Sequence, residues 1–86
     1  MPEVSRFYGI VITMYFDEHN PPHFHADYGE DRAIISISPV DLLMGSLPRR
    51  ALNLVLDWAE LHQDELIANW ERLRQNGQFE KIPPLR

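Results

Sequence analysis

The sequence predicts an α+β fold, in which a small antiparallel meander of three or four strands precedes one long or bent C-terminal helix that packs on one sheet face. Two observations predict this order. Up to residue 45, apolar residues alternate with polar ones or form short β-branched and aromatic runs. From residue 46 to 76 they follow helical spacing instead.

Length and composition predict one domain over residues 1–86. The chain has 86 residues, 44% of them hydrophobic and 24% charged, which is typical of a small globular domain. We expect the meander at 5–45, the helical region at 46–76 and an extended tail at 77–86. No repeat or low-complexity segment indicates a second unit.

The first two strands are predicted at 10–16 and 23–28. The first run is β-branched or aromatic at nearly every position, and the turn composition Asp-Glu-His-Asn-Pro-Pro follows it. The second run alternates, so that successive side chains point to opposite faces. One face receives His23, His25 and Asp27, and the other receives Phe24, Ala26 and Tyr28.

The third strand is predicted at 32–38, after a two-residue hairpin turn that begins with Gly29. A slip of one residue would turn a strand inside out, so the apolar pattern sets the register. The expected neighbours are Ala26 with Ile12 and Ala33, His25 with Thr13 and Ile34, His23 with Tyr15 and Ser36, and Asp27 with Arg32. Residues 40–44 could add a short fourth strand that ends at Gly45.

The helical region has Ser46 as its expected N-cap and Pro48 in its first turn. An unbroken helix from 46 to 76 would be about 45 Å long at 1.5 Å per residue, which exceeds the expected width of so small a domain. Two alternatives remain open. The helix bends near His62-Gln63-Asp64, or its end protrudes and presents an apolar surface to a partner, formed by Ile67, Trp70 and Leu73.

Charge disfavours a direct nucleic-acid binder. The chain has 13 acidic and 8 basic residues, a net charge of -5, so it does not attract phosphate backbones non-specifically. It has no cysteine, which removes disulfides and thiolate zinc sites. The first residues show no basic segment followed by an apolar one, and no apolar run approaches membrane-spanning length. We expect a cytoplasmic protein that does not contact a membrane.

The block His-Asn-Pro-Pro-His-Phe-His, which begins at His19, holds three of the four histidines. His23 and His25 lie two residues apart on a predicted strand, so their imidazoles share a face. With His19 or Asp17 from the preceding loop, they could supply the ligands of a divalent metal such as Zn, Mn, Fe or Ni. The other interpretation is that the histidines are hydrogen-bonding residues on an exposed or partner-covered sheet face.

Two arginines follow the expected N-cap. Arg49 and Arg50 lie near the start of the helical region, where free backbone N–H groups favour anions. They could therefore bind a phosphate or another anion. The alternative is that both are solvated side chains on the polar face of the helix.

Several segments together resemble one known family. They are the block Ser-Arg-Phe-Tyr-Gly-Ile from Ser5, the block Asp-Glu-His-Asn-Pro-Pro-His-Phe-His from Asp17, and Leu-Pro-Arg-Arg-Ala from Leu47, with Trp58 and Trp70. This pattern resembles the small bacterial proteins of the domain of unknown function 4160 family over nearly the whole chain. The resemblance implies a free-standing bacterial domain, often encoded beside a second small protein of the family numbered 2442, in an arrangement similar to toxin and antitoxin pairs.

Two functions are consistent with these features. The first is a protein-binding component of a two-gene, toxin–antitoxin-like or regulatory system, whose partner is the neighbouring-gene product or a second copy, held by the histidine face or the C-terminal helix. The alternative is a metal-dependent or histidine-based hydrolase or nuclease. Its candidate catalytic residues are His19, His23, His25 and Tyr15.

Overall fold

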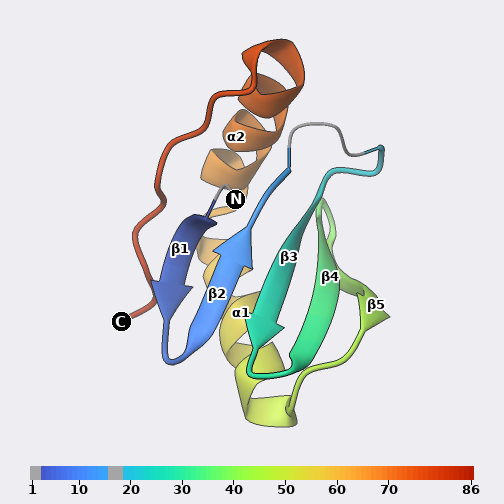
Figure 1. Cartoon of the computed structure of the whole chain (residues 1–86), viewed down its shortest axis with the longest axis vertical. Helices are drawn as coiled ribbons and strands as arrows, with labels where there is room; N and C mark the ends of the chain where they lie inside the picture. The colour runs from blue at the N-terminus through green and yellow to red at the C-terminus, as the bar shows by residue number, and fades with distance from the viewer. Residues whose placement is uncertain (1–2, 16–18) are drawn as a thin grey trace.

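The computed structural model describes residues 3–15 and 19–86, which form a sheet with two helices on one face (Figure 1). The described strands make one antiparallel sheet in chain order. They are β1 (Glu3–Phe7), β2 (Ile10–Thr13), β3 (His23–Tyr28), β4 (Asp31–Ile37) and β5 (Val40–Gly45), followed by α1 (Arg49–Leu61) and α2 (Gln63–Asn76). The predicted antiparallel meander and C-terminal helical region are confirmed, with five strands in place of three or four and two helices in place of one.

The predicted register is confirmed across β2, β3 and β4. Ala26 lies opposite Ile12 and Ala33, and His25 lies opposite Thr13 and Ile34. Ile12, Ala26 and Ala33 are fully buried beneath the helices. The alternation therefore fixed the register, because a shift by one residue would have exchanged this apolar row for His25 and its neighbours.

Strand β1 is the element that the sequence pattern did not predict. Between Glu3 and Ser5 the pairing with β2 shifts at a bulge, and both Val4 and Ser5 are buried. A bulge inserts one extra residue and breaks the alternation of faces. The segment therefore lacks the period of two by which the other strands were recognised.

The start of the first helix also differs from the prediction. Ser46 is not the N-cap, because its backbone N–H donates to the carbonyl of Arg32 at 3.1 Å and so continues the sheet. Helix α1 begins at Arg49 with Pro48 as its N-cap, and the Pro48 carbonyl accepts from the N–H of Leu52 at 2.9 Å. The chain thus leaves the sheet later than the Ser46 signal indicated.

The helical region bends at His62, as one alternative predicted. His62 has φ -117° and ψ 26°, which ends α1 and turns α2 back toward the sheet. On α2, Trp70 is 1% exposed and Leu73 is 3% exposed, and Ile67 packs partly buried against the same core. These three residues therefore do not form an exposed apolar surface, because the bend packs them against the core. Their role as a partner interface stays a prediction.

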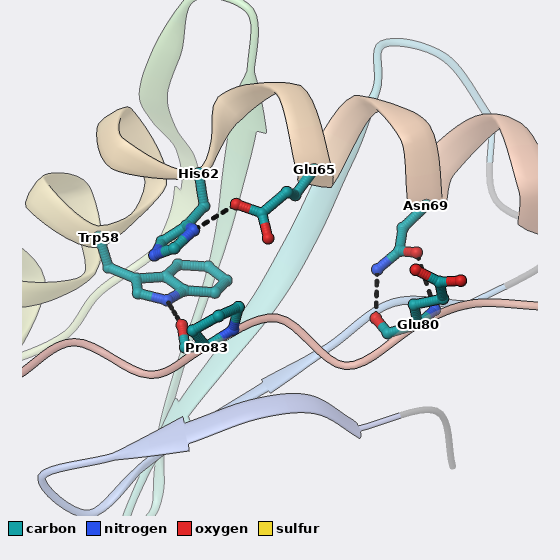
Figure 2. A network of polar contacts seen from close by, with 6 residues as sticks. All are labelled: Trp58, His62, Glu65, Asn69, Glu80 and Pro83. Atoms are coloured by element: carbon teal, nitrogen blue, oxygen red, sulfur yellow. Dashed lines mark hydrogen bonds and ion pairs between the residues drawn. The ribbon is translucent and has the colours of Figure 1, made fainter.

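The C-terminal tail after α2 has no regular secondary structure and is anchored at several points (Figure 2). The amide of Asn69 forms two hydrogen bonds with the backbone of Glu80, at 2.8 and 2.9 Å. Further along, the Trp58 indole N–H donates to the Pro83 carbonyl at 2.9 Å. The Ile82 N–H donates to the Val4 carbonyl at 2.8 Å, so the tail covers the β1 edge of the sheet.

No helix in the described part of the chain is long and apolar enough to cross a membrane.

Candidate functional site

The two histidines of β3 lie side by side. Their ring centroids are 5.5 Å apart, with the ring planes inclined by 58°. His25 is 9% exposed and lies between Thr13 of β2 and Ile34 of β4, on the sheet face that points away from the helices. We call His23 and His25 the histidine pair.

Tyr15 completes an aromatic row with this pair. The register predicts Tyr15 beside His23, but pairing between β2 and β3 ends at Thr13. The Tyr15 ring instead contacts the His25 ring edge-on, with 4.9 Å between the ring centroids. Thr13 is 2% exposed, and its hydroxyl has no hydrogen-bond partner among the residues that the structure describes. The neighbours of His25 on the β2 side are thus one aromatic side chain, Tyr15, and one buried polar side chain, Thr13.

His23 connects the pair to the helical layer. Its Nδ1 lies 2.8 Å from the Pro21 carbonyl oxygen. A carbonyl oxygen only accepts, so Nδ1 is the donor of this hydrogen bond. The ring also packs on Trp70 of α2, with 5.1 Å between centroids. This contact depends on the bend at His62, which brings α2 back to the sheet.

An ion pair borders the row at the other end of β3. Arg32 donates two hydrogen bonds to the Asp27 carboxylate, at 2.6 and 3.0 Å, as the register predicts. These hydrogen bonds and the charge of Asp27 raise the pKa of the Arg32 guanidinium above its usual value, and Tyr15 adds a smaller contribution. Because Arg32 is half exposed, the pair adds little to stability, but it holds a fixed charge at the border.

The predicted metal ligands are only partly brought together. His19 is exposed in the loop before β3, and Asp17 lies outside the described residues. Within residues 3–15 and 19–86, no group of three histidine, aspartate or glutamate side chains could hold a metal ion. A site that includes Asp17 stays a prediction.

The two arginines of the predicted anion site lie in the first turn of α1 and are exposed. That turn has no acidic residue. Both arginines line an open hollow beside Asn53, and Arg50 also lines a separate hollow with Tyr8. Anion binding itself stays a prediction.

The family model of domain of unknown function 4160 matches residues 9–71. The chain belongs to this family. No curated protein and no solved structure matches the chain. The part of this DUF4160 protein that matches the family model contains the histidine pair, both arginines and Trp70, whereas β1 and the tail lie outside it.

Sequence reasoning missed the roles of three aromatic residues in this DUF4160 protein. Trp70 was assigned to an interface, and nothing local indicates that it packs on His23. Tyr8 and Tyr28 were assigned no role, although they line the same hollow as Arg50. The glycines Gly9 and Gly29 could have indicated that the two tyrosines lie close together, because each marks a hairpin turn. In a meander, the turn between β1 and β2 and the turn between β3 and β4 lie at the same end of the sheet.

Proposed function

We propose that this DUF4160 protein is a protein-binding component of a two-gene system, and that its partner contacts the sheet face opposite the helices. We call this surface the open face and define it by Val11, Ile34 and Met44. The proposal depends chiefly on one observation. Met44 is 65% exposed and pairs with Ile34, on the sheet face opposite the one that both helices cover (Figure 1).

The apolar residues of the open face are continuous with the histidine pair. Ile34 lies opposite both His25 on β3 and Met44 on β5, so the three side chains form one row across the sheet. Val11 lies one row away, beside Asp27. Apolar and aromatic residues with a charged pair at the rim are the usual composition of a protein interface.

The difference between the two edges of the sheet favours a partner that binds on the β5 side. The tail covers the β1 edge, whereas no described strand lies beyond β5. Leu43 and Met44 of β5 are 43% and 65% exposed. The β5 register shifts opposite Ile34 and Ile35, and a bulge there disfavours continuous pairing with another strand. The partner therefore binds mainly through side chains.

The net negative charge of the chain favours a different protein as the partner over a second copy of the chain. The chain carries a net charge of -5, so two copies repel each other at long range. A partner with positive net charge would associate faster and more selectively. The neighbouring-gene product implied by the family resemblance is the first partner to test.

Replacing Met44 by glutamate is expected to weaken this complex at least about tenfold, since it places a charge in the apolar centre of the interface. The unfolding midpoint should change little, because Met44 is largely exposed. The measurement is isothermal titration calorimetry of the purified chain with the neighbouring-gene product.

Leu61→Glu is the matched control. Leu61 is 71% exposed at the end of α1, in the helical layer, and the substitution makes the same change in charge. We expect its affinity to stay within about twofold of the parent, since solvent and salt screen a charge on the opposite side of the molecule from the interface. Equal weakening by both variants would contradict an interface on the open face, and so would the absence of a complex with the parent chain.

A histidine-based hydrolase or nuclease is the second candidate, and one observation favours it. The imidazoles of the histidine pair and the Tyr15 phenol lie in contact, so they could exchange a proton with a substrate. This function requires that His23→Ala and His25→Ala abolish activity without lowering the unfolding midpoint. Its metal-dependent form also requires stoichiometric metal in the purified chain, measured by elemental mass spectrometry, and loss of that metal in the double variant.

A further inference from the structure

A second hollow lies at the opposite end of β3 from His23. It has a volume of about 170 Å³, and its walls include Tyr8 of the first hairpin turn, Tyr28 at the end of β3, and Arg50 of α1. Ile10, Ala51 and Leu54 also line it. Three segments that are distant in sequence thus converge on one small and mainly apolar space.

We propose that this hollow binds a small aromatic carboxylate, with the ring between the tyrosines and the carboxylate on Arg50. The size of the hollow suits one ring, because an engineered apolar protein cavity of about 150 Å³ binds benzene. Aromatic walls favour an aromatic ligand, since ring pairs contribute attraction beyond the area that they bury.

The backbone of the first turn supports a role for Tyr8 outside the chain's own core. Tyr8 has φ 50°, a left-handed conformation that is unfavourable for residues with a Cβ and is usually occupied by Gly, Asn or Asp in such turns. Its side chain is 59% exposed, so burial within the chain does not compensate for that cost. Within the chain its ring meets only the edge of Phe7 among the described aromatic contacts, at 6.5 Å between centroids, and a bound ring would bury more of it.

The position of Tyr28 is set by the neighbouring glycine of the same turn. A Cβ on Gly9 would lie 3.3 Å from Cε1 of Tyr28, which is tighter than ordinary packing. Gly9 also has φ 80°. The glycine thus lets the Tyr28 ring approach the first turn closely, and the two tyrosines come to line one hollow.

Arg50 supplies the positive charge that would bind the carboxylate of the ligand. Within the described residues it forms no ion pair and no side-chain hydrogen bond. The first turn of α1 has no acidic residue to compensate it, although the chain as a whole is acidic. A guanidinium binds a carboxylate with two parallel hydrogen bonds, so the unused donors of Arg50 fit this ligand class.

The test is an NMR titration of the full chain with phenylacetate and with its neutral analogue, phenylacetamide. We expect saturable binding of phenylacetate in the millimolar range, as for other ligands of this size, with shifts at Gly9 and Ala51. Phenylacetamide should bind about tenfold more weakly, because it lacks the charge-assisted hydrogen bonds. The absence of saturable binding would overturn the proposal.

Arg50→Gln should weaken phenylacetate binding about tenfold, whereas Arg49→Gln should change it by less than about twofold. Arg49 is the matched control, because it lies in the same turn and carries the same charge but lines only the other hollow. Equal losses in the two variants would assign the effect to general charge attraction and overturn the site.

Tyr8→Asn tests the aromatic wall. Asparagine tolerates the left-handed conformation, so the unfolding midpoint should stay the same or rise while binding weakens. A lower midpoint would assign Tyr8 a structural role and overturn its place in the site. This site lies at the turn end of the sheet, and the open face carries the interface proposed above, so each proposal can fail without the other.

Discussion

Replacing Trp70 by alanine is expected to lower the free energy of unfolding by about 3–5 kcal/mol, the usual cost of truncating a buried aromatic side chain. Trp70 is 1% exposed and belongs to the hydrophobic core, and its ring also packs on His23 at the start of β3. Small domains have only about 5–15 kcal/mol of stability in total. The variant should therefore unfold at a much lower denaturant concentration, measured by circular dichroism.

Trp70→Phe is the matched control for the loss of ring contacts. The indole N–H of Trp70 is buried and has no hydrogen-bond partner among the described residues, so phenylalanine removes no hydrogen bond to them. We expect a loss of about 1–2 kcal/mol from reduced packing volume. A stable Trp70→Ala variant that fails only to bind a partner would contradict the burial of α2 and return Trp70 to an exposed interface.

The strands show which part of this fold the sequence could predict. Alternation on β3 determines which side chains face the core, so His25 could be placed between Thr13 and Ile34 without coordinates. The same method failed at β1, because the bulge at Val4 removes the alternation. A local pattern predicts an element only where its period is unbroken.

The course of α2 could not be decided from the sequence for a different reason. Apolar residues keep helical spacing on both sides of His62, so a straight helix and a bent one have the same pattern. Tertiary contacts favour the bend: Leu66 is fully buried in the core, and the Gln63 side chain donates to the Ile37 carbonyl at 2.7 Å. These partners lie far away in sequence, and no local signal identifies them.

The same limit applies to the candidate site. Spacing on one strand predicted that His23 and His25 are neighbours, and the ring contact bears this out. The contact between His23 and Trp70 joins residues that are distant in sequence and was not predictable. Nor were the tyrosine walls of the second hollow, because they depend on how α1 packs beside two hairpin turns.

Replacing Asn69 by leucine is expected to lower the free energy of unfolding by about 1–3 kcal/mol, since it removes both hydrogen bonds to Glu80 and each contributes about 0.5–1.5 kcal/mol. Asn69 is 1% exposed, and its amide group pairs with both the N–H and the carbonyl of Glu80. Leucine has a similar volume, so the loss reflects the missing hydrogen bonds. Chemical denaturation of the full chain measures it.

The local consequence is release of the tail, which native-state hydrogen exchange can follow. The Ile82 N–H bonds to the Val4 carbonyl, and the Ile82 side chain is 4% exposed. Without the Asn69 anchor, we expect the Ile82 amide to exchange much faster than amides at the centre of β3, since the tail can then open without global unfolding. Tail opening would also uncover the β1 edge and favour association between chains.

Two further variants separate the anchor from other effects. Asn53→Leu makes the same change at an exposed position of α1 and should alter stability by no more than about 0.5 kcal/mol. Asn69→Asp keeps an acceptor for the Glu80 N–H but cannot donate to the Glu80 carbonyl, and it places a charge at a buried position. The Arg72 guanidinium, which donates to the Asn69 Oδ1 at 3.1 Å, would partly compensate that charge, so the expected loss near neutral pH is similar to the loss with leucine. If the Ile82 amide stayed protected in both Asn69 variants, the tail would be held by Trp58 and the β1 edge alone, and the Asn69 anchor would be wrong.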